Sequence, residues 1–206
     1  MKKLLIIGAR GFGREVYELA RNQYEVKGFL DSKADAFAGL NGDYPPILGA
    51  VETYEPQEDD VFFCALGDPF YRRIYADIIL AKGGEFISLI AKGAFVNPTA
   101  KIGKGVIISA WTQVSDNVQI GDFTMVHSYC TFGHDAKIGA NNSIEAYCFF
   151  GGYSQTGDNV TMHVRSMIIR HKRVGSNVTV GAGSVVMRNH GDNLHLFGNP
   201  AKKINF

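Results

Sequence analysis

His134 is followed directly by Asp135 in the segment Gly133-His134-Asp135-Ala136. A neutral imidazole, with an ordinary pKa of about 6.5, can take a proton from an amine or a hydroxyl group near pH 7. A carboxylate beside the ring can fix the tautomer and stabilise the imidazolium that forms. The pair is therefore a candidate general base for acyl transfer, although a surface histidine beside an acidic residue would give the same pattern.

A glycine-rich turn is the second candidate site. The apolar run from Lys3 to Ile7 ends in Gly8-Ala9-Arg10-Gly11-Phe12-Gly13, and a helical pattern follows. Such a turn at a helix N-terminus lets the backbone approach a phosphate group. The dinucleotide fingerprint G-x-G-x-x-G needs glycine where this chain has Arg10, which disfavours NAD. A purely structural turn and a nucleotide or nucleotide-sugar site both stay open.

A six-residue frame positions the histidine. Sixteen of the seventeen frame positions are apolar, Thr156 being the exception, whereas a 46% hydrophobic composition would fill about half of them. A strict period of six is typical of repeats that bury their faces by stacking on one another. The frame comprises Ile90, Val96, Ile102, Ile108, Val114, Ile120, Val126, Phe132, Ile138, Ile144, Phe150, Thr156, Met162, Ile168, Val174, Val180 and Val186.

Two further positions repeat within this frame. The residue after the apolar anchor is often glycine, which we expect to make tight corners because it accepts backbone angles that other residues avoid. These glycines are Gly103, Gly121, Gly133, Gly139, Gly151, Gly157, Gly175 and Gly181. The residue four places after the anchor is usually short, as at Cys130 and Cys148, and we expect it to point inward.

The first part of the chain has a different organisation. Lys3 to Ile7, Val26 to Leu30 and Val61 to Leu66 are predicted strands, with a shorter strand near Phe86 to Leu89. Helices are predicted from Arg14 to Arg21 and from Phe70 to Ala81, and Ser32 to Asp60 is predicted to be mostly loop. Strands that alternate with helices indicate a small, Rossmann-like parallel α/β domain.

The six-residue frame resembles the hexapeptide repeat of the left-handed parallel β-helix acyltransferases. The resemblance implies three hexads per triangular coil, so that residues eighteen apart lie side by side, about 4.8 Å from each other. We therefore expect an α/β domain over residues 1–87 and a left-handed β-helix with a C-terminal tail over residues 88–206. Gly152 lies eighteen residues after His134 and should sit beside it.

Both halves together resemble the sialic-acid O-acetyltransferase and bacillosamine-type nucleotide-sugar N-acetyltransferase family. The likeness rests on the glycine turn, the Gly28-Phe29-Leu30-Asp31 strand end, the β-helix and the segment from Phe197 to Lys202. It implies a cytoplasmic homotrimer that transfers acetyl from acetyl-CoA to a nucleotide-linked amino sugar in surface-glycan biosynthesis. The resemblance also implies that the active sites lie between subunits and that no metal is required.

The resemblance also implies roles for individual residues. His134 would be the base, Asp135 its orienting partner and the Gly152 amide the donor to the oxyanion. Acetyl-CoA would lie along later coils, near Gly152, Gly181, Ala182, Gly183, Pro200 and Lys202. The nucleotide sugar would contact Gly8, Arg10, Gly11, Phe12, Gly13, Asp31, Gly67 and His127.

Three residues depart from the family pattern. Members commonly carry His at Phe12, Asn at His127, and a second His at Ser143. These positions lie near where the family places substrate or acetyl-CoA, so they put the substrate in doubt more than the reaction.

Other functions stay open. One is O-acetylation of sialic acid or a related sugar. Another is a zinc enzyme like the γ-type carbonic anhydrases, since His127 and His163 are two coils apart with Glu145 between them. A catalytic zinc usually has three protein ligands, and the third family His falls at Ile168, which cannot ligate. A non-enzymatic trimeric scaffold would have no need for His134 and Asp135 beside Gly152.

Composition narrows the class of protein. The net charge is +1, with 21 basic and 20 acidic residues among 206, which gives no footprint for nucleic acid. Three cysteines argue against a disulfide framework, and Cys130 and Cys148 should stack in the core. The sequence shows no signal peptide or membrane span, as expected for a cytoplasmic protein.

Overall fold

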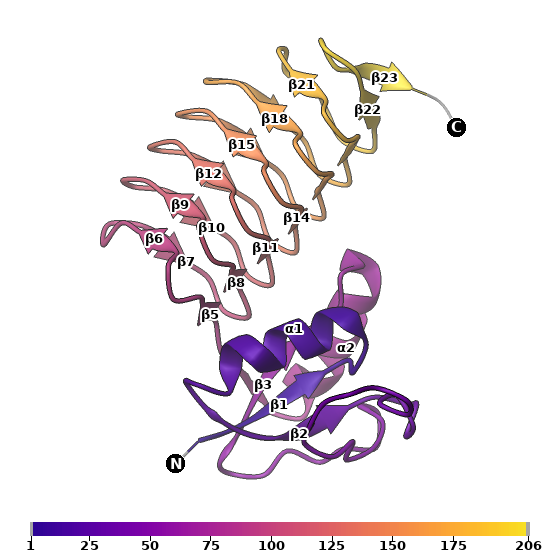
Figure 1. The fold of residues 1–206 in the computed structure, drawn as a ribbon. Helices are drawn as coiled ribbons and strands as arrows, with labels where there is room; N and C mark the ends of the chain where they lie inside the picture. The colour runs from indigo at the N-terminus through magenta and orange to yellow at the C-terminus, as the bar shows by residue number, and fades with distance from the viewer. Residues whose placement is uncertain (1, 205–206) are drawn as a thin grey trace. The chain divides into compact units, whose positions relative to one another are not determined.

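The chain divides between Leu89 and Ile90 into two units, which a computed structural model describes over residues 2–204 (Figure 1). The first unit is a four-stranded parallel sheet in the order β2-β1-β3-β4 with two helices. Its elements are β1 (Lys3–Ile7), α1 (Gly11–Ala20), β2 (Glu25–Leu30), β3 (Asp60–Cys64), α2 (Pro69–Ala81) and β4 (Glu85–Phe86). From β1 the chain moves outward to β2 and then crosses to β3 on the other side of β1. The strand order therefore reverses between β1 and β3.

The predicted elements of this unit are confirmed, with small shifts at their ends. α1 begins three residues earlier than predicted because Arg10 is already the extended N-cap residue, and its carbonyl accepts the Arg14 N–H at 3.1 Å. α2 begins at Pro69, where the Asp68 side chain caps the helix by accepting the Phe70 N–H at 2.8 Å. The strand predicted to run to Leu66 ends at Cys64. The segment from Ser32 to Asp59 has no helix or strand beyond one bridge, Phe29 to Ile47.

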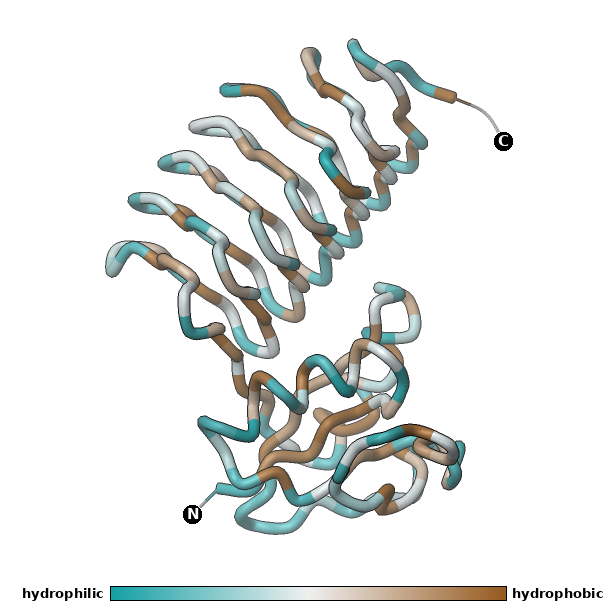
Figure 2. Tube along the Cα trace, in the orientation of Figure 1, coloured by the Kyte–Doolittle hydropathy of each residue, from teal (hydrophilic) through white to brown (hydrophobic). Residues whose placement is uncertain are grey.

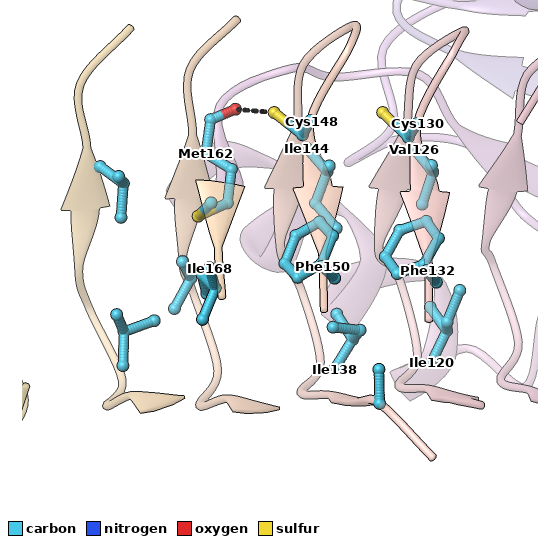
Figure 3. Close-up of a cluster of buried hydrophobic side chains, with 14 of the residues drawn as sticks. Ile120, Val126, Cys130, Phe132, Ile138, Ile144, Cys148, Phe150, Met162 and Ile168 are labelled. Carbon is cyan, nitrogen blue, oxygen red and sulfur yellow. Dashed lines mark hydrogen bonds between the residues drawn. The ribbon is translucent and has the colours of Figure 1, made fainter. Parts of the chain in front are cut away.

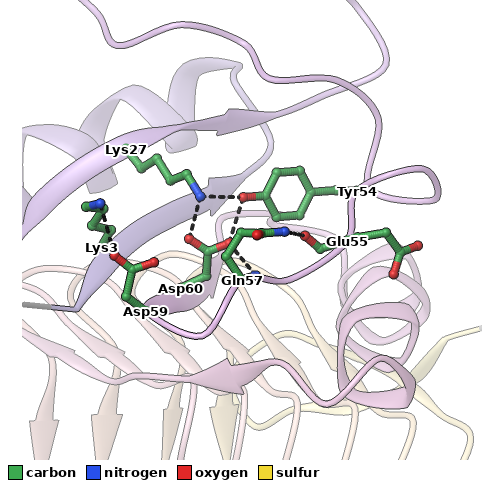
Figure 4. A network of polar contacts seen from close by, with 7 residues as sticks. All are labelled: Lys3, Lys27, Tyr54, Glu55, Gln57, Asp59 and Asp60. Atoms are coloured by element: carbon green, nitrogen blue, oxygen red, sulfur yellow. Dashed lines mark hydrogen bonds and ion pairs between the residues drawn. The ribbon is translucent and has the colours of Figure 1, made fainter.

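A buried carboxylate ties the edge of this sheet together (Figure 4). Asp60, whose side chain is fully buried, accepts hydrogen bonds from Lys27 Nζ at 2.7 Å, the Tyr54 hydroxyl at 2.7 Å and the Gln57 N–H at 2.9 Å. Burial raises the pKa of Asp60, but these hydrogen bonds outweigh it and hold the pKa below its usual value. The folded chain therefore stabilises the charged form of Asp60 more than its protonated form.

Replacing Asp60 by asparagine should lower the free energy of unfolding at pH 7 by about 3 kcal/mol, because Lys27 loses its charged partner. A depressed carboxyl pKa stabilises the fold above the unfolded-state pKa of about 3.9, and this stabilisation is lost as the pH falls through the folded-state pKa. Urea unfolding between pH 7 and pH 3 should therefore show a smaller loss of stability on acidification for Asp60→Asn than for the wild type.

Asp59→Asn is the matched control for this prediction. Asp59 pairs with Lys3 at 3.0 Å, but both side chains are more than a third exposed. An exposed pair contributes little to stability, so this variant should unfold much like the wild type. An equal loss of stability in both variants would show that burial of the Asp60 network does not matter.

The second unit is a β-helix built from three sheets of parallel two-residue strands, except that β22 and β23 have three residues and β23 is antiparallel. One sheet holds β7 (Lys101–Ile102), β10 (Gln119–Ile120), β13 (Lys137–Ile138), β16 (Gln155–Thr156) and β19 (Arg173–Val174). Another holds β6 (Phe95–Val96), β9 (Gln113–Val114), β12 (Thr131–Phe132), β15 (Phe149–Phe150), β18 (Met167–Ile168) and β21 (Val185–Val186). The remaining sheet holds β5 (Leu89–Ile90), β8 (Ile107–Ile108), β11 (Met125–Val126), β14 (Ser143–Ile144), β17 (Thr161–Met162), β20 (Thr179–Val180), β22 (His195–Phe197) and the antiparallel β23 (Lys202–Ile204).

The register of these sheets confirms the eighteen-residue coil. Ile120 pairs with Ile138, and Phe132 pairs with Phe150. The last coil is two residues shorter, because Thr179 pairs with His195. The apolar frame ends at Val186, within this shortened coil.

Four-residue corners connect the strands, and we name each set by one member. The Trp111 corner comprises residues 91–94, 109–112, 127–130, 145–148, 163–166 and 181–184. The His134 corner comprises residues 97–100, 115–118, 133–136, 151–154 and 169–172. The Asn141 corner comprises residues 103–106, 121–124, 139–142, 157–160, 175–178 and 191–194.

The backbone of these corners corrects one prediction. The glycines that follow the anchors do not supply the positive φ angles; the residue two places further on does, as at Asn117, Asp135 and Tyr153. Glycine is needed after the anchor because the next coil is too close. A Cβ on Gly133 would lie 2.6 Å from the backbone nitrogen of Gly152. The prediction of tight corners was right, but the reason given for their glycines, the conformational freedom of glycine, was wrong.

The apolar frame forms the core of the β-helix, and apolar segments recur from coil to coil (Figure 2). Phe132 and Phe150 stack with ring centroids 4.7 Å apart, and the predicted stacking of the buried Cys130 and Cys148 is confirmed (Figure 3). Ile90 departs from the prediction, since 40% of it is exposed in the first coil.

The exception in the frame, Thr156, has a polar partner that the sequence did not reveal. Its hydroxyl accepts hydrogen bonds from the Gly139 N–H at 3.1 Å and the Asn142 side chain at 2.8 Å. Asn142 is itself buried, and its Oδ1 accepts the Val160 N–H. The two side chains satisfy each other, so a polar pair is tolerated inside the stack.

Candidate active site

His134 and Asp135 form a hydrogen-bonded pair at the His134 corner. The distance from His134 Nδ1 to Asp135 Oδ2 is 2.8 Å. A carboxylate can only accept, so the neutral ring carries its proton on Nδ1 and leaves a free lone pair on Nε2. The His134 side chain is 59% exposed, so a substrate can reach Nε2. The pair therefore has the tautomer that a general base needs.

The sequence spacing correctly places Gly152 against this imidazole. A Cβ built on Gly152 would lie 2.9 Å from His134 Nε2, 3.1 Å from Cε1 and 3.3 Å from Cδ2. Other coils carry Asp116 and Arg170 at the same corner position, so the backbone there accepts side chains. Glycine at this coil leaves room for the ring of His134.

The Gly152 amide is available as a hydrogen-bond donor. Among residues 2–204, no acceptor takes the Gly152 N–H, whereas its carbonyl accepts the His171 N–H at 3.0 Å. The equivalent amides of His134 and Arg170 are likewise unpaired within the described chain, so the free donor is a property of this corner. Only at Gly152 does the donor lie directly beside an imidazole.

Three side chains hold the Asp135 carboxylate in its charged form. The hydrogen bond with His134 lowers the pKa of Asp135 most, and hydrogen bonds with Asn117 and Tyr153 lower it further. Asn117 Nδ2 donates to Asp135 Oδ1 at 2.7 Å. Neither Asn117 nor Tyr153 was predicted as a site residue, although each lies eighteen residues from Asp135 and the coil length places both beside it.

The α/β unit holds a cavity of about 460 Å³ at the carboxyl ends of its strands. The lining includes Gly8 after β1, Asp31 after β2 and Gly67 after β3, together with Arg10 and the aromatic side chains Tyr71 and Tyr75. β1 and β3 flank the point where the strand order reverses. Open α/β sheets bind ligands in the crevice at such a point.

Only part of the predicted substrate set lines this cavity. Gly11, Phe12 and Gly13 lie in the first turn of α1 and are not among its lining residues. Gly13 packs on the turn instead, since a Cβ there would lie 1.9 Å from the Gly8 carbonyl oxygen. Asp31 lines the cavity, but its two oxygens accept the N–H groups of Ala9 and Lys33, each at 2.9 Å. It holds the turn in place as well as facing the cavity.

Apart from Gly152, which lies beside His134, the residues predicted to hold acetyl-CoA gather at the end of the β-helix. Gly181, Ala182 and Gly183 form the last part of the Trp111 corner. The loop that contains the cis Asn199–Pro200 bond returns to the same coil, where the Ala201 N–H donates to the Val185 carbonyl at 2.8 Å. Lys202 begins β23 and pairs with Phe197. Gly181, Ala182 and Gly183 therefore lie at a different corner from His134.

The Trp111 corner also carries His127 and a second histidine–carboxylate pair. His163 Nδ1 lies 2.9 Å from Glu145 Oε1, and Glu145 Oε2 accepts the Val164 N–H. The structure therefore does not bring His127 to the same corner as His134. Across residues 2–204, no group of three or more His, Cys, Asp or Glu side chains is placed to hold a metal ion. The zinc alternative thus lacks a ligand set in that range.

Comparison with known proteins matches both units. The family model described as the PglD N-terminal domain matches residues 3–79, and that of the bacterial transferase hexapeptide matches residues 117–152. A UDP-N-acetylbacillosamine N-acetyltransferase of Bacillus subtilis (strain 168) is 32% identical over 113 residues, which are 53% of this chain and 52% of that relative. Residues 3–79 thus belong to the PglD N-terminal domain family, and residues 117–152 carry the hexapeptide repeats of bacterial transferases. The chain spans about half the length of the curated relative that it matches.

Solved structures of similar proteins cover the whole chain. The acetyltransferase domain of PglB from Neisseria gonorrhoeae FA1090, in complex with acetyl coenzyme A, is 27% identical with a TM-score of 0.72 and covers 98% of this chain and 99% of that one. PerB from Caulobacter crescentus, in complex with CoA and GDP-perosamine, shares the fold at 24% identity. Its TM-score is 0.82, and the match covers 100% of this chain and 98% of PerB. None of the helices within residues 2–204 has the length and apolar character to cross a membrane.

Proposed function

We propose that this chain transfers the acetyl group of acetyl-CoA to the amino group of a nucleotide-linked sugar, in surface-glycan biosynthesis. The observation that carries the proposal is the His134 imidazole, held through Nδ1 by Asp135 and flanked at Nε2 by Gly152. The relatives support the acceptor, since one is a UDP-N-acetylbacillosamine N-acetyltransferase and another binds CoA and GDP-perosamine. A relative in complex with acetyl coenzyme A supports the donor.

The reaction needs one proton to move twice. As the sugar nitrogen attacks the thioester carbonyl, His134 Nε2 takes a proton from that nitrogen, and Asp135 stabilises the imidazolium. The Gly152 N–H donates to the oxyanion of the tetrahedral intermediate. When the carbon–sulfur bond breaks, the imidazolium returns the proton to the leaving CoA thiolate. The amide product and free CoA leave with His134 neutral again.

The α/β domain, taken as residues 1–87, would hold the nucleotide end of the substrate. Gly8, Arg10, Asp31 and Gly67 line a cavity at the strand-order reversal, where Arg10 supplies the positive charge for a phosphate. Gly11, Phe12 and Gly13 begin α1, and the partial positive charge of a helix N-terminus also favours a phosphate. We propose that these residues together bind the diphosphate and nucleoside.

Acetyl-CoA would lie along Gly181, Ala182, Gly183, Pro200 and Lys202, with the thioester near Gly152. Small residues fit an extended ligand here, since a Cβ on Gly183 would meet no other atom within 4 Å. Because Gly181, Gly183 and His127 belong to a different corner from His134, we propose that a homotrimer completes the site. The His134 corner of one copy would then face the Trp111 corner of the next.

The exposed apolar residues of the β-helix support this assembly. The Trp111, Tyr129 and Tyr147 rings stack at 5.0 Å and 4.8 Å, and each is at least 44% exposed. Phe95 and Phe149 are exposed on the adjacent sheet. We expect light scattering to give three times the mass of one chain, and Trp111→Glu to shift the protein toward smaller species. A monomer that is fully active would contradict the shared site.

Thiol release from acetyl-CoA tests the proposed function. The panel comprises UDP-, GDP- and dTDP-linked amino sugars, with sialic acid as a hydroxyl acceptor. Turnover of an amino sugar, inhibited by the matching free nucleotide, is the expected result. Turnover only of the hydroxyl acceptor would contradict N-acetylation, and failure to bind acetyl-CoA at all would contradict the enzyme.

A further inference from the structure

The Asp135 carboxylate has a second side-chain partner besides His134. Oδ2 of Asp135 faces His134 Nδ1, while Oδ1 accepts a hydrogen bond from Asn117 Nδ2 at 2.7 Å. Asn117 occupies the same corner position one coil earlier and has a φ of 55°, close to the 61° of Asp135. With one oxygen held by each neighbour, the plane of the carboxylate is fixed on both sides.

Asn117 is itself held by the coil before it. Its backbone N–H donates to the Thr99 hydroxyl oxygen at 2.8 Å, and Thr99 Oγ1 lies 2.6 Å from Asp116 Oδ1. Three successive coils thus contribute a connected column of Thr99, Asn117 and Asp135 that ends at the His134 ring. Connected hydrogen bonds orient a group more strictly than a single one.

Tyr153 supports the pair from the following coil. The Tyr153 hydroxyl helps to lower the pKa of the Asp135 carboxyl, and the Tyr153 ring meets the His134 ring edge-on, with centroids 5.1 Å apart and an angle of 89°. The other face of Tyr153 stacks on His171 at 4.9 Å. Tyr153 is therefore held against the His134 ring, and its hydroxyl favours the charged form of Asp135.

This support matters because the His134 ring is open to solvent. At 59% exposure of the side chain, water competes for the ring and for the carboxylate. A free histidine in water prefers the tautomer with its proton on Nε2, which cannot act as a base at that atom. A carboxylate that points steadily at Nδ1 reverses the preference.

We propose that Asn117 and Tyr153 are positioning residues, which lock the Asp135 carboxylate so that His134 keeps its proton on Nδ1 and presents Nε2 to the acceptor. Neither side chain takes part in the chemical step. The inference rests on the proposed acetyl transfer for its kinetic consequence, but the locked tautomer can be measured without turnover.

The test compares Asn117→Gly and Tyr153→Phe with the wild type. Glycine accepts the positive φ at position 117, and phenylalanine keeps the ring at position 153. Each variant should lower kcat about tenfold, as outer hydrogen-bonding partners do at other sites, with KM for both substrates unchanged. Asn159→Gly is the matched control, since Asn159 is exposed, has a φ of 57° and donates to Asn177 Oδ1 at the Asn141 corner. It should keep the wild-type kcat.

The decisive measurement is the ¹⁵N chemical shifts of the His134 ring, assigned by comparison with His134→Ala. In the wild type and in Asn159→Gly the neutral ring should be protonated at Nδ1, whereas Asn117→Gly should move population toward Nε2. A fall in kcat without this shift would mean a merely structural role and overturn the proposal, as would a wild-type kcat in Asn117→Gly. If the wild type transfers no acetyl group, the proposed function fails, and the tautomer alone still supports or overturns the positioning.

Discussion

Replacing His134 by alanine should lower kcat for acetyl transfer by about 10²- to 10⁴-fold, the usual contribution of a positioned general base. We expect a fall in kcat of this size because Asp135 fixes the His134 ring and leaves Nε2 free to take the proton. The side chain is mostly exposed and lies outside the β-helix core, so the variant should fold and still bind acetyl-CoA. Steady-state kinetics with an amino-sugar acceptor, alongside isothermal titration with CoA, separate the two effects.

The chain supplies its own matched control in His163. This histidine faces Glu145 at 2.9 Å and has a side chain that is 42% exposed, so it forms a similar pair at the Trp111 corner. His163→Ala should keep most of the activity, because the equivalent amide one coil further is already paired: the Gly181 N–H donates to the Leu196 carbonyl at 2.8 Å. Loss of activity in His163→Ala with retention in His134→Ala would move the site to the other pair.

Gly152→Ala should lower kcat by about 10²-fold although the N–H stays in place. The new Cβ would lie 2.9 Å from His134 Nε2, so the ring must move away from the position that it holds against the oxyanion donor. A displacement of about 1 Å at a reacting group can cost about 10²-fold in rate. Steady-state kinetics measure the loss, and Gly191→Ala is the control, since its Cβ would meet nothing within 4 Å.

The same clash predicts a thermodynamic signature. All three atoms nearest to the added Cβ belong to His134, so Gly152→Ala should cost no stability in a His134→Ala background. Urea unfolding of the two single variants and the double variant gives this cycle. A wild-type kcat in Gly152→Ala, or an equal stability loss with and without His134, would contradict the placement of the ring beside Gly152.

The hexad frame made the β-helix predictable because each anchor must face the same stack. The pairing of Phe132 with Phe150 follows from spacing alone, and so does the approach of Gly152 to His134. The reason for the corner glycines did not follow, because close contact between coils is a tertiary property that a single repeat does not display. The buried pair of Asn142 and Thr156 was hidden for the same reason, since neither residue reveals its partner.

The site residues related to His134 by the eighteen-residue coil could be predicted, whereas those defined by their contacts in the folded chain could not. Asp135 and Gly152 are both related to His134 by local or eighteen-residue spacing. Asn117 and Tyr153 have the same spacing from Asp135, but their types suggest no chemistry until their contacts with the pair are seen. In the α/β unit, Asp31 faces the cavity as expected, yet its carboxylate also binds two backbone amides, which only the fold of the turn reveals.

The most direct test of the central claim is the product of a reaction that contains acetyl-CoA and a nucleotide-linked amino sugar. Mass spectrometry and proton NMR of the sugar from wild-type and His134→Ala reactions identify the acetylated atom. We predict one added acetyl group, on the sugar nitrogen, with the wild type and almost none with the variant. Acetylation at a hydroxyl, or equal product from both proteins, would contradict the account.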